Sequence, residues 1–248
     1  MPAAISASTR SRATGRFLFG FLACSLALGL IAALAFLAFP EIDLLVSGVF
    51  YDGHRRFAGQ SLGWVQSSRA VFIVVFWLCV AGSLTGLFMT RERTRTWLRF
   101  TFAEWLFLAI CIATGPGFVA NLVFKDHWGR ARPTQIVEFG GAKAFTPALL
   151  PADQCANHCS FVSGEAASIF VAFYATSLVV TRGAGLLLIA GTLLGFAAGL
   201  TRMAQGAHFL SDVVFAGVFM ALTVVVVYRA MFGPIAHRPP RPVAAKNV

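Results

Sequence analysis

Charge is scarce in this chain: only 12% of its 248 residues are charged, and only 10 of them are acidic. A soluble domain of this length normally carries roughly a quarter charged residues. Long polar stretches are missing too, so little sequence is left over to build a second, water-exposed domain. Because 58% of the residues are apolar, we expect one domain embedded in a membrane.

A continuous basic stripe with interleaved aromatic residues is also missing, although the formal net charge is +10. The arginines instead cluster at the ends of apolar segments, where they orient helices in a membrane. This distribution argues against a nucleic-acid partner.

A second cluster of metal ligands is absent from the sequence. Cys155, His158 and Cys159 lie together in one loop, and a zinc site normally needs a further ligand cluster. The pattern therefore favours a disulfide or free thiols over zinc, and we expect no metal and no cofactor.

Six apolar runs dominate what is present, each near the roughly 20 residues that cross a bilayer as a helix. Their approximate ranges are 17–39, 70–89, 100–123, 164–180, 184–200 and 209–228. The first run could be a signal peptide, but its roughly 23 residues exceed a usual signal core, so we favour a retained helix. Gly115-Pro116-Gly117 should kink the third run.

The predicted fold is all-α: a polytopic membrane protein with six transmembrane helices. We divide it into a disordered cytoplasmic lead (1–16), a six-helix membrane domain (17–230) and a basic cytoplasmic tail (231–248). With both termini inside, the cytoplasmic segments hold twelve of the 20 Lys and Arg, as the positive-inside rule expects. The eight cations on the other face are Arg55, Arg56, Arg69, Lys125, Arg130, Arg132, Lys143 and Arg202.

Three short segments collect unusual polar residues: 125–133, 160–165 and 202–212. The predicted topology places all three on the outer face of the membrane. Polar groups that gather at one edge of the membrane also argue against a transporter, whose site should lie near the midplane.

These segments predict a phosphate cradle. Lys125, Arg132 and Arg202 supply three cations, and arginine offers phosphate a bidentate fork. Ser163 and Gly164 stand where a helix begins, so free N–H groups and the helix dipole would face the same anion. A simple helix cap is the alternative role for Ser163.

His208 and Asp212 are four residues apart and would share one face of a helix. A carboxylate that accepts from one imidazole nitrogen leaves the other free to attack. Beside three cations, we interpret His208 as a nucleophile and not as a structural histidine.

Three short patterns together resemble the type 2 phosphatidic acid phosphatase superfamily. The first is Lys125, six residues and then Arg132-Pro133, and the second is the helix start Ser163-Gly164. The third is Arg202, five residues, His208, three residues and Asp212. The resemblance covers about residues 17–230 and implies a metal-independent hydrolase with a phosphohistidine intermediate. It makes His208 the nucleophile and Asp212 its orienting partner. The phosphate-binding residues that it implies are Lys125, Arg132, Ser163, Gly164 and Arg202.

One position departs from the family pattern. The family has histidine after Ser-Gly as the general acid, whereas this chain has Glu165. Glu165 could replace that acid if burial raises its pKa, or could be a solvated carboxylate at a helix start. His127 and His158 are alternative donors.

The 134–162 loop resembles the branch that acts on lipid A in Gram-negative bacteria, with the 4′-phosphate favoured over the 1-phosphate. That resemblance implies a bacterial inner membrane and a periplasmic active site, with a membrane lipid phosphate as substrate. The alternatives are an undecaprenyl diphosphate or phosphatidylglycerophosphate phosphatase, a lipid phosphotransferase, and a lipid binder without catalysis.

Overall fold

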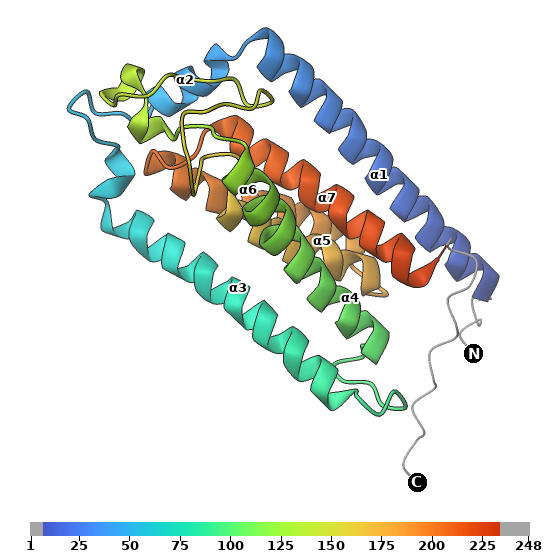
Figure 1. Ribbon diagram of the computed structural model, residues 1–248. Coiled ribbons are helices and arrows are strands. Elements are labelled where there is room, and N and C mark those ends of the chain that lie inside the picture. The colour runs from blue at the N-terminus through green and yellow to red at the C-terminus, as the bar shows by residue number, and fades with distance from the viewer. Residues whose placement is uncertain (1–6, 234–248) are drawn as a thin grey trace.

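Long apolar helices make up most of the protein (Figure 1), whose computed structural model describes residues 7–233. The helices are α1 (Ala7–Ala38), α2 (Glu41–Gly48), α3 (Gly63–Met89), α4 (Phe102–Ile112), α5 (Gly164–Val179), α6 (Ala184–Ala204) and α7 (Leu210–Phe232). A π-helix, η2 (Ala113–Lys125), continues α4, and short 3₁₀ turns lie at η1 (Ala58–Gln60), η3 (Pro133–Gln135) and η4 (Val137–Phe139). The prediction of an all-α fold is confirmed.

Five helical segments of the described chain are long and apolar enough to cross a membrane, which makes this a multi-pass membrane protein. They are Gly15–Ala38, Gly63–Met89, Phe102–Lys125, Ala184–Ala204 and Leu210–Phe232. The fourth predicted span, which becomes α5, is the remaining one and has only 16 residues, or about 24 Å at 1.5 Å per residue.

The two N-terminal spans expose large apolar side chains to their surroundings. Phe19 on α1 and Trp77 on α3 are 67% and 61% exposed. Helix surfaces covered by large apolar side chains are unfavourable in water. They are expected where the helix faces lipid.

The helix α5 lies at the centre, and most of its side chains are buried. Glycines on α6 let that helix approach closely: a Cβ atom at Gly195 would lie 2.4 Å from the Phe170 ring, and one at Gly191 would lie 2.3 Å from Phe173. Small residues at helix contacts are the usual packing device in membranes. The central position of α5 fixes its N-terminus, which begins at the residues predicted to bind phosphate.

The third span changes its backbone hydrogen bonding at Ala113, where α4 passes into η2. Pro116 lies inside η2 and has no N–H to donate to the turn before it. The break expected at Gly115-Pro116-Gly117 therefore takes the form of a π-helix, and π-helical segments frequently accompany functional sites. Lys125 is the last residue of η2.

The structure bears differently on the two predicted tails, the N-terminal lead and the basic C-terminal tail. The helix α1 already begins at Ala7, so residues 7–16 are helical and not an irregular lead. The predicted basic tail, 231–248, lies outside the described residues beyond 233. Figure 1 shows the start of α1 and the end of α7 at one end of the bundle, with α2 and the loop after η2 at the opposite end.

Candidate active site

The predicted site residues come from separate segments and meet at the α2 end of the bundle (Figure 1). Lys125 ends η2, Arg132 follows in the loop, Ser163 and Gly164 start α5, Arg202 lies in the last turn of α6, and His208 and Asp212 lie at the start of α7. The start of α5 touches the start of α7 directly, because Ser163 N–H donates to the Asp212 carbonyl at 3.1 Å. The structure thus brings these residues together.

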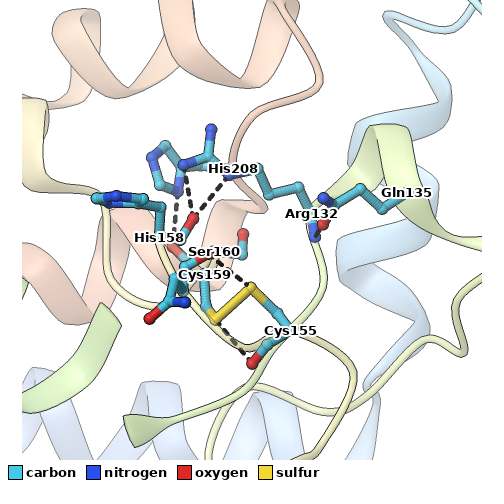
Figure 2. Close-up of a disulfide and its surroundings, with 8 residues drawn as sticks. Arg132, Gln135, Cys155, His158, Cys159, Ser160 and His208 are labelled. Carbon is cyan, nitrogen blue, oxygen red and sulfur yellow. Dashed lines mark hydrogen bonds between the residues drawn. A yellow bond between two sulfur atoms is a disulfide. The ribbon is translucent and has the colours of Figure 1, made fainter. Parts of the chain in front are cut away.

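His208 is buried, with 3% of its surface exposed, in the turn before α7. Its Nδ1 lies 2.7 Å from the backbone carbonyl of Ser160 (Figure 2). A carbonyl only accepts, so Nδ1 carries the proton and Nε2 of the neutral ring keeps a free lone pair. Asp212 Oδ2 is farther from Nδ1, at 3.6 Å. The nearer partner of His208 is therefore Ser160, and Asp212 lies behind it at a longer distance.

Burial lowers the pKa of His208 to about 4, since the charged ring would lose its hydration. Asp212 opposes this change, while the nearby cations Lys125 and Arg202 add to it. The ring is neutral at physiological pH, which is the form that can act as a nucleophile.

Asp212 is fully buried and its carboxylate is held on all sides. It accepts hydrogen bonds from Arg130 Nη1 at 2.6 Å and from Ser160 Oγ at 2.5 Å. The backbone N–H of Phe209 donates to it at 2.8 Å, which caps the start of α7. Ser160 therefore joins the two residues of the pair: its hydroxyl binds Asp212 and its carbonyl binds His208.

The buried Ser163 Oγ of the cradle has no hydrogen-bond partner among the described residues. The side chain of Ser163 does not cap α5, so the helix-cap alternative is not observed. A Cβ atom at Gly164 would lie 2.7 Å from Lys125 Nζ, so a larger residue would displace this ammonium group. A hydroxyl without a partner beside a cation suits an oxyanion.

Arg132 is held by the loop that precedes α5. Its Nε and Nη2 donate to the His158 carbonyl at 3.2 and 2.8 Å (Figure 2). The structure pairs Cys155 with Cys159 in a disulfide, which selects one of the alternatives left open by the sequence. The disulfide closes the short loop that presents His158, so it supports the placement of Arg132.

Glu165 lies between two guanidinium groups. Arg69 Nε donates to its two oxygens at 3.0 and 3.2 Å, and Arg202 Nε lies 3.4 Å from Oε1. Its side chain is 24% exposed. Glu165 is therefore neither an isolated buried acid nor a freely solvated carboxylate, the two interpretations that the sequence allowed.

The two other histidines proposed as donors occupy different places. His158 is exposed, with its carbonyl turned to Arg132. His127 is exposed after η2, and its Nδ1 lies 2.9 Å from the Leu122 carbonyl.

Sequence reasoning missed four residues that shape the site: Asp43, Arg69, Arg130 and Ser160. The topology had marked Arg69 and Arg130 as outer cations that break the positive-inside rule, and this signal could have identified both. Ser160 lies in the polar segment 160–165, but its contact with His208 uses a backbone carbonyl, which no side-chain pattern signals.

Comparison with known proteins gives one consistent result. Residues 104–235 match the PAP2 superfamily. The chain is 39% identical to the lipid A 4′-phosphatase of Francisella tularensis subsp. novicida, covering 79% of this chain and 89% of that protein. It is 38% and 32% identical to the lipid A 4′-phosphatases of Rhizobium etli and Rhizobium leguminosarum, over 72% of this chain and 74% and 82% of those proteins. No solved structure matches the chain significantly.

Proposed function

Since the chain belongs to the PAP2 superfamily, we propose that it is a lipid A 4′-phosphatase that works through a metal-independent phosphohistidine intermediate. The carrying observation is the neutral His208, whose Nδ1 is held by the Ser160 carbonyl, beside a cradle in which the buried Ser163 hydroxyl has no hydrogen-bond partner among the described residues. Relatives that bear this activity in their names align over most of the chain and support the substrate.

The first step is phosphoryl transfer to His208. Lys125, Arg132 and Arg202 hold the phosphate dianion, while Ser163 Oγ and the first N–H groups of α5 stabilise its equatorial oxygens in the transition state. Nε2 attacks phosphorus, an N–P bond forms and the P–O bond to the sugar breaks. The leaving oxygen takes a proton from Glu165.

The second step returns the enzyme to its starting state. Water attacks phosphorus, the N–P bond breaks, and Glu165 takes the water's proton as inorganic phosphate forms. Arg69 and Arg202 stabilise the carboxylate of Glu165 in the free protein. A phosphate dianion bound by Arg202 would share this cation with Glu165, so the proposed proton donor stands next to the substrate.

The membrane arrangement is part of the proposal: six crossings, both termini in the cytoplasm, and a periplasmic active site in a bacterial inner membrane. The short helix α5 completes the six as the fourth crossing in chain order, and most of its side chains are buried. The Cys155–Cys159 disulfide supports this orientation, because the periplasm is oxidising and the cytoplasm is not.

Purified protein in detergent with bis-phosphorylated lipid A tests the function. Mass spectrometry of the lipid and release of inorganic phosphate should both report loss of the 4′-phosphate, with and without a chelator. His208→Ala should lower the rate by about 10⁵-fold, because it removes the nucleophile. The exposed His54 provides the matched control, and His54→Ala should keep full activity.

The same assay separates the alternatives. Faster turnover of phosphatidylglycerophosphate or undecaprenyl diphosphate would replace lipid A as the substrate. A newly phosphorylated lipid without free phosphate would mean a phosphotransferase. Full activity of His208→Ala, or activity that strictly requires a metal, would contradict the mechanism.

A further inference from the structure

We propose that Asp43 and Arg130 are positioning residues for phosphoryl transfer, acting through Asp212 on the nucleophile His208. This inference rests on the proposed function, since it names residues that serve the same reaction. Asp43 lies on α2, outside residues 104–235 that match the family. The helix α2 would then be a working part of the site and not only a connection between two spans.

Arg130 is completely buried and joins two carboxylates. Its Nη2 lies 2.8 Å from Asp43 Oδ2, and its Nη1 lies 2.6 Å from Asp212 Oδ1. Nη1 also donates to Ser211 Oγ at 2.8 Å, and Nε donates to the Thr146 carbonyl at 2.9 Å. Four of the five guanidinium N–H groups are thus engaged.

Aromatic rings confine the same guanidinium group. Its central carbon lies 4.2 Å from the centre of the Phe209 ring and 5.6 Å from that of Phe145. Phe209 is the residue between His208 and α7, so Arg130 packs directly against the segment that carries the nucleophile. The geometry allows Arg130 little freedom to turn toward another partner.

Asp43 reaches the first turn of α7 by a second route. Its Oδ1 accepts the backbone N–H of Ser211 at 2.9 Å, and its Oδ2 accepts the Ser211 hydroxyl at 2.5 Å. Asp43 itself is 1% exposed. One carboxylate therefore holds both Arg130 and the backbone of α7 beside Asp212.

The connection to the nucleophile runs through Ser160. Asp212 accepts from the Ser160 hydroxyl, and His208 Nδ1 donates to the Ser160 carbonyl. A displaced Asp212 would move Ser160, and the imidazole would lose the acceptor that sets its tautomer. Groups behind a reactive histidine commonly act in this way on its orientation.

The charges explain why Asp43 is needed as well as Arg130. Three fully buried ionic groups are stable only when each is paired and hydrogen-bonded. Asp43 neutralises part of Arg130 and fixes its plane, so that Nη1 meets Asp212. Without this second carboxylate, Arg130 would be drawn entirely to Asp212 and no longer held in the plane that Asp43 defines.

The test is Asp43→Asn in the full-length protein, assayed with lipid A in detergent. We expect kcat to fall 10- to 100-fold, the range typical of residues that orient an active group. KM and the binding of inorganic phosphate should stay within about threefold, since Lys125, Arg132 and Arg202 are untouched. Glu41→Gln on the exposed face of α2 is the matched control and should keep wild-type values.

A double-mutant cycle separates positioning from a general structural role. If Asp43 acts through Asp212, then Asp43→Asn should lower kcat little further in an Asp212→Asn background. Fully additive losses, or an unchanged kcat in Asp43→Asn alone, would overturn the inference.

Ser211→Ala provides a second variant should Asp43→Asn fail to fold. It removes the hydroxyl between Asp43 and Arg130 but keeps both charges, so kcat should fall severalfold with KM unchanged. An unchanged kcat there would also overturn the inference. Inactive wild-type protein and inactive Glu41→Gln would instead mean that the proposed function has failed.

Discussion

The two carboxylates nearest the phosphate cradle, Asp212 and Glu165, lie in opposite kinds of surroundings. Asp212 is fully buried and accepts hydrogen bonds from Arg130, Ser160 and a backbone N–H. Glu165 is 24% exposed and is held by ion pairs to Arg69 and Arg202.

The difference shows how one site can use the same chemical group in two ways. A carboxylate with every oxygen engaged in a dry interior keeps its geometry and its charge. A carboxylate near solvent, held by cations of the proposed phosphate site, lies where a donor to the leaving group is needed. In the proposed mechanism, Asp212 supports the position of His208, and Glu165 serves as the proton donor.

The largest expected effect is at the buried carboxylate. Asp212→Asn should lower kcat by about 10⁴-fold, comparable to the loss when a histidine-orienting aspartate is neutralised elsewhere. The amide cannot accept from all three donors at once and leaves Arg130 with one carboxylate fewer. Kinetics with lipid A would measure this, with the exposed Asp153→Asn as the matched control. A loss below tenfold would remove Asp212 from the mechanism.

The next largest effect is on the pH dependence of protein stability, which reports whether His208 is buried away from water. Burial lowers the pKa of His208 to about 4, so the folded protein holds the ring neutral while the unfolded chain protonates it near pH 6.5. The contribution of His208 to the free energy of unfolding is therefore fully present above pH 6.5. It falls by about 3 kcal/mol as the pH is lowered toward 4. Thermal unfolding in detergent between pH 7 and 4 should show a steeper decline for wild type than for His208→Asn. Equal declines would mean that the ring is not held neutral.

The smallest effect is expected at the half-buried carboxylate, Glu165. Glu165→Gln should slow lipid A hydrolysis by about 10²-fold, the usual contribution of a general acid. An activated aryl phosphate should be slowed only a few-fold, because its leaving group needs no proton. The exposed Glu138→Gln serves as the control. Equal slowing of both substrates would leave Glu165 only the task of aligning Arg69 and Arg202.

Much of the fold was readable from local sequence. The long apolar runs predicted membrane helices, and five of them are long enough to span. The family inferred from the spacing of Lys125, Arg132, Ser163, Arg202 and His208 is confirmed by the match over residues 104–235. The amphipathic helix α2 was not predicted, because its eight residues lie in a segment that reads as a polar connection.

The hydrogen-bond partners inside the site were harder to predict from the sequence. The spacing of His208 and Asp212 suggested a direct hydrogen bond, yet Ser160 lies closer to Nδ1. A pattern of side chains does not reveal a backbone carbonyl as a partner. The same limit applies to Arg130, whose sequence neighbours Lys125 and Arg132 face the cradle while it faces the interior.

The sequence by itself determined that the protein lies in a membrane, where its long helices run and which family it belongs to, because each follows from composition or from short spacing. Tertiary structure alone decided which charges are paired. Arg130 meets Asp43 across 87 positions of the chain, Arg69 meets Glu165 across 96, and His208 meets Ser160 across 48. Such contacts depend on how the helices pack around α5, and packing in a membrane is set by close side-chain fit that no local pattern encodes.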